Sequence, residues 1–467
     1  MVDLIAYHLT SLPMRPVFRP VPEDTRAWFA SGSNPPEHGQ TPAEILADFR
    51  AHVEPYPLGN GHPSFFGWVN SPPAVMSVFA EALAAAMNPS VAGGNHAAVH
   101  LERQVVEWFR GLLRLPEGSM GMFVSGGSMA SLTALAVARH VAARKVGVDV
   151  RAQGLQGLAK RFVLVTGEGG HSCLRKSAEL LGIGSDQIIV IGSDEHRRMR
   201  VAELEEALGR AKREGHVPIA VAATAGTVNT GAIDPLDALA DVCARHDVWL
   251  HVDAAYGGPA LLSTTYAEEL HPLARAHSVA LDPHKWLYVP VEAGLVLVSD
   301  AAAMRDTFSL VPPYLRTDGS ATGVGGPPWF SEYGFQQTRG FHALKVWIAL
   351  KFFGIEGYRT LIDHDIAMAD RLAQRISGQS DLDLVAHGLS IVCFRYAPAG
   401  LRSDPGRLDD LNKRIVEGIQ LGGRAFLTST MLEGRFVLRA CVINLRTTEA
   451  EIDALVDLVR STGAELA

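Results

Sequence analysis

The sequence predicts an α/β fold in which a mostly parallel sheet of seven strands is covered by helices on both faces. Short apolar runs without polar alternation are typical of strands that are buried on both faces. Amphipathic stretches, such as Val201–Glu214 and Pro235–Asp247, lie between most of these runs. Strands that alternate with helices indicate parallel pairing. The predicted strands are Met122–Ser125, Phe162–Thr166, Gln187–Ile191, Ile219–Thr224, Val248–Asp253, Val279–Asp282 and Gly294–Val298.

Three segments are predicted along the chain. Residues 1–73 begin with a helix-like stretch and continue through proline-rich connections, so we expect them to pack on another surface, that of a partner subunit. Residues 74–345 form the large domain, and their glycine- and proline-rich loop at about 311–334 is predicted to be a lid that carries Tyr314. Residues 346–467 are predicted to form a smaller α/β domain.

Composition excludes several classes of protein. Of the 467 residues, 47% are hydrophobic and 20% are charged, which is ordinary for an enzyme, and the net charge of −8 argues against nucleic-acid binding. No apolar run is long enough to span a membrane, and the start of the chain does not resemble a secretory signal. The four cysteines are scattered without metal-ligand spacing, so we expect no metal site and a reducing, cytoplasmic location.

Two residues at the ends of predicted strands indicate the chemistry. Asp253 ends the apolar run WLHVD, and Lys285 lies in DPHKW just after the next predicted strand. A carboxylate and a lysine are both costly to bury unless each finds a partner. Asp253 as a helix cap or as the partner of a surface arginine is the alternative. Pyridoxal 5′-phosphate (PLP) satisfies both groups, because a lysine forms a Schiff base with its aldehyde and an acid keeps its ring nitrogen protonated.

Other predicted strand ends supply polar or small groups to the same edge of the sheet. In MFVSGGSMASLTAL, Gly127 and Ser128 lie where a strand turns into a helix, an arrangement that suits a phosphate, although plain structural turns look the same. His171 follows the next strand and is predicted to stack on the cofactor ring, with a helix cap as the alternative. Thr224 ends a further strand, and Ala255 is small enough to lie beneath the ring.

With these residues in place, the sequence resembles the PLP-dependent group II amino-acid decarboxylases of fold type I, and most closely their aromatic L-amino-acid branch. The likeness runs over nearly the whole chain. It rests on the ordered motifs HPSFFGW, LERQVVEWF, VSGGSMASLTAL, HSCLRKS, TAGTVNTGAIDPL, HVDAAYGG, DPHKWLYVP and FVLRACVINLRTT.

The resemblance implies a role for each candidate residue. Lys285 would form the Schiff base, His171 would stack on the ring, and Asp253 would pair with the ring nitrogen. The resemblance also implies a homodimer with the active site at the interface, a loop in which Tyr314 protonates the product carbon after carbon dioxide leaves, and a substrate pocket that includes Trp68. The remaining residues implied to contact the cofactor or the substrate carboxylate are Gly127, Ser128, Thr224, Ala255 and His284.

Three departures from the family pattern are present. Met129 replaces a glutamate that often follows the glycine turn. Asp282 stands where many animal members carry asparagine, and because its charge would repel a phosphate, we expect it to point away or to be offset by a donor. Around Trp68 the pocket wall is thinner, since Val69 and Asn70 replace bulkier residues.

The expected activity is decarboxylation of an L-amino acid, aromatic or related, to an amine and carbon dioxide. One alternative is a relative that decarboxylates and then lets oxygen convert the substrate to an aldehyde; such enzymes commonly replace the loop tyrosine with phenylalanine or the stacking histidine with asparagine. Another is a catalytically silent PLP-binding protein, which would be expected to lack the lysine or the tyrosine. The chain retains Tyr314, His171 and Lys285.

Overall fold

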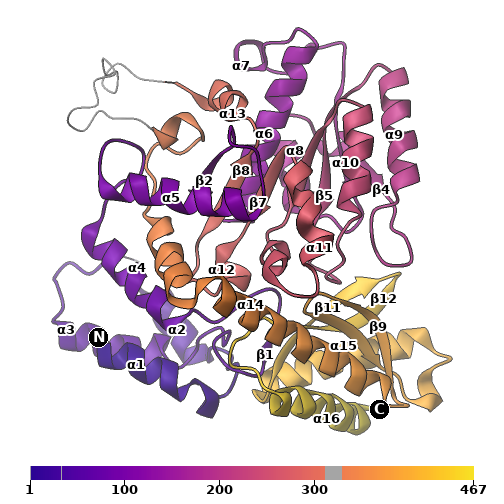
Figure 1. The fold of residues 1–467 in the computed structure, drawn as a ribbon. Helices are drawn as coiled ribbons and strands as arrows, with labels where there is room; N and C mark the ends of the chain where they lie inside the picture. The colour runs from indigo at the N-terminus through magenta and orange to yellow at the C-terminus, as the bar shows by residue number, and fades with distance from the viewer. Residues whose placement is uncertain (1, 33, 311–328) are drawn as a thin grey trace. The chain divides into compact units, whose positions relative to one another are not determined.

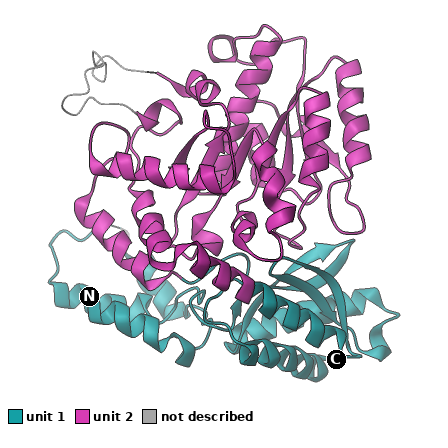
Figure 2. Cartoon of the chain, in the orientation of Figure 1, with its two compact units in different colours: residues 1–72, 365–467 teal, residues 73–364 magenta. Residues whose placement is uncertain are grey.

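The computed structural model describes residues 2–32, 34–310 and 329–467. The chain forms two compact units, one of residues 73–364 and one of residues 1–72 together with 365–467 (Figure 2). Within the described ranges, no helix has both the length and the apolar character needed to cross a membrane.

The larger unit is built on a seven-stranded sheet in the order β2-β8-β7-β6-β5-β3-β4 (Figure 1). Strand β8 is antiparallel to both of its neighbours, and all other pairs are parallel. The predicted mostly parallel sheet is therefore confirmed, and strands β2 to β7 all end at the same edge. The bounds are β2 Met120–Val124, β3 Phe162–Gly167, β4 Ile188–Ile191, β5 Val217–Thr224, β6 Trp249–Asp253, β7 Ser278–Leu281 and β8 Gly294–Val298.

Helices cover both faces of this sheet (Figure 1). On one face, α6 (Gly127–Lys145) packs against β5, β6, β7 and β8 and against α8 (Cys173–Leu180). On the other face, α9 (Val201–Arg213) and α10 (Leu236–Arg245) pack together. Most buried residues of α6 are alanines or other small residues, which lets its backbone lie close to the strands.

Most of the remaining helices belong to this unit, and α14 continues past residue 364 into the other unit. Residues 329–334, which were predicted to be the last part of the lid, are folded. Phe330 is fully buried, and Arg305 pairs with Glu332 at 2.5 Å. The long helix α14 is interrupted at Gly354, where φ is 65°. The bounds are α4 Val75–Met87, α5 Ala97–Leu112, α7 Val150–Gln153, α11 Ala267–Leu270, α12 Pro283–Trp286, α13 Ala301–Phe308 and α14 His342–Ser377.

A buried ion pair fixes the strand that leads to the glycine turn. Glu102 and Arg339 are in contact, and both side chains are almost inaccessible. The amide of Phe123 in β2 donates to Glu102 (3.0 Å), while Arg339 donates to the carbonyl of Phe123 (2.6 Å). Burial raises the pKa of Glu102, and the guanidinium opposes that effect. The pair thus satisfies both backbone groups of one residue near the end of β2.

The smaller unit contains a five-stranded sheet in the order β1-β11-β12-β10-β9. Strand β1 comes from the amino-terminal segment and pairs in parallel with β11, whereas the other pairs are antiparallel. The sequence did not predict that the two ends of the chain share a sheet. The bounds are β1 Phe65–Phe66, β9 Leu382–Gly388, β10 Ile391–Tyr396, β11 Phe426–Leu432, β12 Arg435–Cys441, α1 Val2–Ser11, α2 Glu23–Ser31, α3 Pro42–Asp48, α15 Pro405–Gly422 and α16 Glu449–Leu466.

Candidate active site

The carboxyl edge of the seven-stranded sheet brings several predicted residues together. Thr224 and Asp253 are register partners on β5 and β6, and Asp253 is in turn the register partner of Ala280 on β7. On the other side of β7, β8 begins at Gly294, which pairs with Val124 at the end of β2. The glycine turn, Asp253 and the helix that carries Lys285 therefore all follow strand ends at one edge of the sheet.

The glycine turn at the start of α6 is closely packed. A Cβ atom at Gly127 would lie 2.9 Å from the Cβ of Ala255 and 3.0 Å from Oδ2 of Asp282. A Cβ atom at Gly294 would lie 2.4 Å from the Cα of Gly126. Only glycine permits both approaches. Because the first amides of a helix have no partner within the helix, this turn can bind an anion such as phosphate.

Lys285 lies in the short helix α12, immediately after β7. Its Nζ atom is 3.0 Å from Oδ2 of Asp282, and the two side chains are 25% and 4% exposed. Burial lowers the pKa of Lys285, but the carboxylates of Asp282 and then Asp253 outweigh it, so the pKa is raised overall. The negative charge of Asp253 therefore contributes to this rise, and the charge of Asp282 is offset by the Lys285 donor.

Backbone amides hold the strand ends that carry Asp253 and Thr224. Oδ1 of the buried Asp253 accepts from the amide of Ala255 at 3.1 Å. The amide of Thr224 donates to Oδ2 of Asp234 at 2.8 Å, and Met199 donates to Oδ1 of the same carboxylate at 2.7 Å. Burial raises the pKa of Asp234 to about 6 despite these two donors. The sequence gives no signal for this role of Asp234, because its two donors come from the end of β5 and from the loop before α9.

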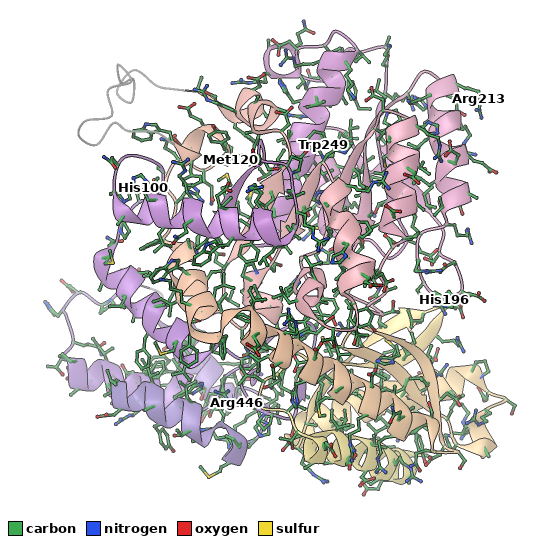
Figure 3. The ribbon with its side chains drawn as sticks, in the orientation of Figure 1. His100, Met120, His196, Arg213, Trp249 and Arg446 are labelled. Atoms are coloured by element: carbon green, nitrogen blue, oxygen red, sulfur yellow. The ribbon has the colours of Figure 1, made fainter. Side chains whose placement is uncertain are left out.

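A buried hydrogen-bond network is centred on His251, which lies two residues before Asp253 on β6. His251 has its Nδ1 3.0 Å from Oγ of Ser278 and its Nε2 3.2 Å from Oγ of Ser131. Trp249, labelled in Figure 3, donates its Nε1–H to the same Ser278 oxygen at 2.8 Å. Burial lowers the pKa of His251 to about 4, although Asp253 acts in the opposite direction. Sequence reasoning missed this network; the signal was that alternate strand residues face the same side.

The loop between β3 and α8 carries His171. Its exposed ring accepts, at Nδ1, the amide hydrogen of Cys173 (3.2 Å). Cys173 is buried, and the hydroxyls of Ser131 and Ser128 act to lower the pKa of its thiol. Burial, and then the nearby charge of Asp253, raise the pKa of Cys173 to about 12. The first residue of α8 thus joins the loop of His171 to the surroundings of Asp253 and to the start of α6.

The last three predicted site residues are His284, Tyr314 and Trp68. Nδ1 of His284 lies 2.9 Å from the carbonyl oxygen of Ala293 and 3.8 Å from Oδ1 of Asp282. Tyr314 lies outside the described residues. Trp68 belongs to the smaller unit, where its side chain is 47% exposed. Its ring is next to Phe65 and Phe426, with centroid distances of 6.5 and 5.3 Å.

These groups fit PLP. The sheet edge supplies an amine at Lys285, a buried carboxylate at Asp253 and a closely packed glycine turn at the start of α6. Asp282 is the one feature that does not favour a phosphate at this turn. No group of three or more His, Cys, Asp or Glu side chains suited to hold a metal ion is present in the described parts of the chain.

A mostly parallel α/β sheet whose edge gathers these groups defines a fold type I PLP-dependent enzyme. The chain belongs to the pyridoxal-dependent decarboxylases: the family model "Pyridoxal-dependent decarboxylase conserved domain" matches residues 22–397. Its cofactor is pyridoxal phosphate, and its class of activity is amino-acid decarboxylation, that of a carboxy-lyase.

Individual relatives support this membership over the full chain. Aromatic-L-amino-acid decarboxylase of Bacillus atrophaeus is 35% identical, covering 100% of this chain and 94% of that protein. L-2,4-diaminobutyrate decarboxylase of Rhizobium meliloti is 33% identical, covering 92% of this chain and 84% of that protein. A crystal structure of Oryza sativa TDC with PLP and tryptamine superposes with a TM-score of 0.91 at 27% identity, covering 99% of this chain and 96% of that one.

Proposed function

We propose that this enzyme decarboxylates an aromatic L-amino acid to the corresponding amine and carbon dioxide. The observation that carries the proposal is the 35% identity, over the entire chain, to an aromatic-L-amino-acid decarboxylase. The diaminobutyrate relative is 33% identical over 92% of this chain, and the acidic amino acid decarboxylase GADL1 of Homo sapiens is 30% identical over 92%. The family as a whole therefore acts on several kinds of side chain.

The surroundings of Trp68 support an aromatic substrate. Its indole lies beside Phe65 and Phe426 and exposes about half of its surface. Flat apolar rings offer favourable stacking and edge contacts to a second aromatic group. From the family resemblance, we propose that Trp68 takes part in binding the substrate side chain.

The chain contributes binding, orientation and proton control to the reaction. When bound, PLP draws electrons from the bonds of the substrate α-carbon into its ring. Lys285 would present the amine that holds the cofactor aldehyde, and Asp253 would hold the proton on the ring nitrogen. His171 would cover one face of the ring, and Tyr314 would return a proton to the α-carbon after carbon dioxide leaves. The residues that we assign to cofactor and carboxylate contacts are Gly127, Ser128, Thr224, Ala255 and His284.

A second outcome, the formation of an aldehyde, is favoured by a different relative. Phenylacetaldehyde synthase of Arabidopsis thaliana is 28% identical, covering 96% of this chain and 91% of that protein. One experiment separates the two activities. Carbon dioxide release from each common L-amino acid is measured with hydrogen peroxide in parallel. We expect release with aromatic substrates and no peroxide; release confined to acidic or diamino acids, or peroxide equal to carbon dioxide, would contradict the proposal.

The proposed assembly is a homodimer. Helix α4 exposes an apolar stripe along one side, which is typical of a helix covered by another chain. We propose a second copy of this chain as the partner. The residues of the α4 stripe are Val75, Met76, Phe79, Leu83 and Met87.

We propose a cytoplasmic location. All four cysteines are buried free thiols, which supports a reducing setting.

A further inference from the structure

The carboxylate of Asp282 divides its two oxygens between different surroundings. Oδ2 lies 3.0 Å from Nζ of Lys285. Oδ1 is buried and accepts no hydrogen bond from any described residue, and the closest ring nitrogen of His284 is 3.8 Å away. A buried carboxylate oxygen without a donor is destabilising. The buried carboxylate of Asp282 therefore indicates that its negative charge has a function.

We infer that Asp282 is the counter-ion that holds the amine of Lys285 protonated, a positioning role in which its negative charge, and not a contact to phosphate, is the essential property. This rests on the proposed role of Lys285 as the cofactor-binding amine. The geometry supports it, because the 3.0 Å contact is made by side chains that are 25% and 4% exposed. Solvent screens such a pair far less than it screens an ion pair on the surface.

The other groups that face Lys285 cannot replace this charge. Burial lowers the pKa of Lys285, Asp282 is the largest opposing influence, and Asp253 follows. Cys173, from α8, carries no charge near neutral pH, since its own pKa is raised to about 12. Asp253, from β6, is the acid that we assign to the cofactor ring nitrogen. Asp282 is therefore the carboxylate that remains for the lysine nitrogen.

Asparagine is the informative replacement for Asp282. Asp282→Asn keeps the size of the side chain and one carbonyl oxygen but removes the charge. An opposite charge at this range favours the charged form of an amine by about 1–3 pH units. The variant should therefore lower the pKa of Lys285 by about that amount.

The test is a pair of pH titrations on the full-length protein. In the holoenzyme, the absorption band of the bound cofactor reports protonation of the nitrogen that Lys285 contributes, and we expect its midpoint to fall by about 1–3 units in Asp282→Asn. After removal of the cofactor, acylation of Lys285 by an amine-selective reagent, measured by peptide mass spectrometry, should become at least about tenfold faster at pH 8. Greater accessibility alone would raise that rate equally at every pH and leave the midpoint unchanged.

Two matched variants serve as controls. Asp282→Glu restores the charge and should return the titration toward that of the wild type. Asp241→Asn removes an exposed carboxylate that pairs with Arg275 and should change neither titration. If Asp282→Asn does not fold, Asp282→Ser removes the same charge. Unchanged midpoints in a folded charge-removing variant would overturn the inference, whereas a wild-type protein without a cofactor band would instead contradict the proposed function.

Discussion

Thr224 and Asp253 are register partners at the ends of β5 and β6, and the amide of Ala225 donates to the carbonyl of Asp253 at 2.9 Å. Parallel pairing fixes this relationship. The last residues of β5 and β6 lie at the same edge of the sheet, and the loops that carry the other site residues begin at this edge. The positions of Thr224 and Asp253 are thus set by the pairing of β5 with β6.

Replacing Asp253 by asparagine tests the acid that we assign to the ring nitrogen. The amide keeps an oxygen for the Ala255 N–H but loses the charge. A hydrogen bond to a charged group contributes about 1.5–3 kcal/mol, so kcat/KM should fall on the order of 10- to 100-fold. Steady-state kinetics measures this loss. Asp306→Asn, which removes an exposed partner of Arg144, is the control and should retain activity; equal kinetics for both variants would remove Asp253 from the mechanism.

Tyr314→Phe tests the proposed proton donor. Without the phenol, the cofactor should still bind, but the product should shift from amine toward aldehyde because the α-carbon is no longer protonated promptly. Chromatography of the products, with the cofactor spectrum recorded alongside, measures both effects. Tyr333→Phe, a change at a half-buried tyrosine in the described region, is the matched control. Undiminished amine formation by Tyr314→Phe would exclude this residue as the donor.

His251→Gln tests the buried hydrogen-bond network of His251 through acid stability. A histidine with a folded-state pKa of about 4, against an ordinary value of 6.5, binds its proton more weakly when folded. Its contribution to stability is present above pH 6.5 and is lost as the pH falls toward 4, by about 3 kcal/mol. Urea unfolding between pH 4.5 and 7 should therefore show a shallower pH slope in His251→Gln.

The slope should not vanish in that variant. Burial also lowers the pKa of His342 to about 4, so this second histidine keeps its own contribution. His342→Gln is the parallel control, and we expect it to flatten the slope by a similar amount. If His251→Gln and the wild type lose stability equally over this pH range, His251 is not the neutral, buried group that its contacts indicate.

Glutamate at two positions of the α4 stripe tests the dimer. Phe79 and Leu83 are 41% and 54% exposed, and burying a charge at both should prevent association. Light scattering coupled to size exclusion should give a dimer mass for the wild type and a monomer mass for Phe79→Glu/Leu83→Glu. Leu180→Glu changes an exposed leucine on α8 (75%) and should remain dimeric. A dimeric double variant would place the interface elsewhere.

The sequence predicted the sheet and the main groups of the site for a physical reason. Strands buried on both faces leave continuous apolar runs, and a lysine or carboxylate at the end of such a run is costly enough to be conspicuous. Lys285 and Asp253 were identified in this way. In the structure Asp253 ends β6 and Lys285 lies in α12, directly after β7, and their roles toward the cofactor stay predictions.

Other features have no local signal. Strand β1 has only two residues and pairs with a strand from the other end of the chain, at Phe65 and Phe426, so no periodicity reveals it. The partners of His251 likewise come from α6 and β7. Asp282 was visible as a departure from the family, but only coordinates identify Lys285 as its partner. The roles of Tyr314 and Trp68 stay predictions.

Borohydride reduction of the holoenzyme, followed by peptide mass mapping, tests the central claim most directly. Reduction fixes the cofactor to the side chain that holds it. We predict one pyridoxyl-modified peptide, with the added mass on Lys285 and a loss of the modification in Lys285→Ala. The same mass on another lysine, or an unmodified Lys285 in protein that retains its cofactor band, would contradict the account.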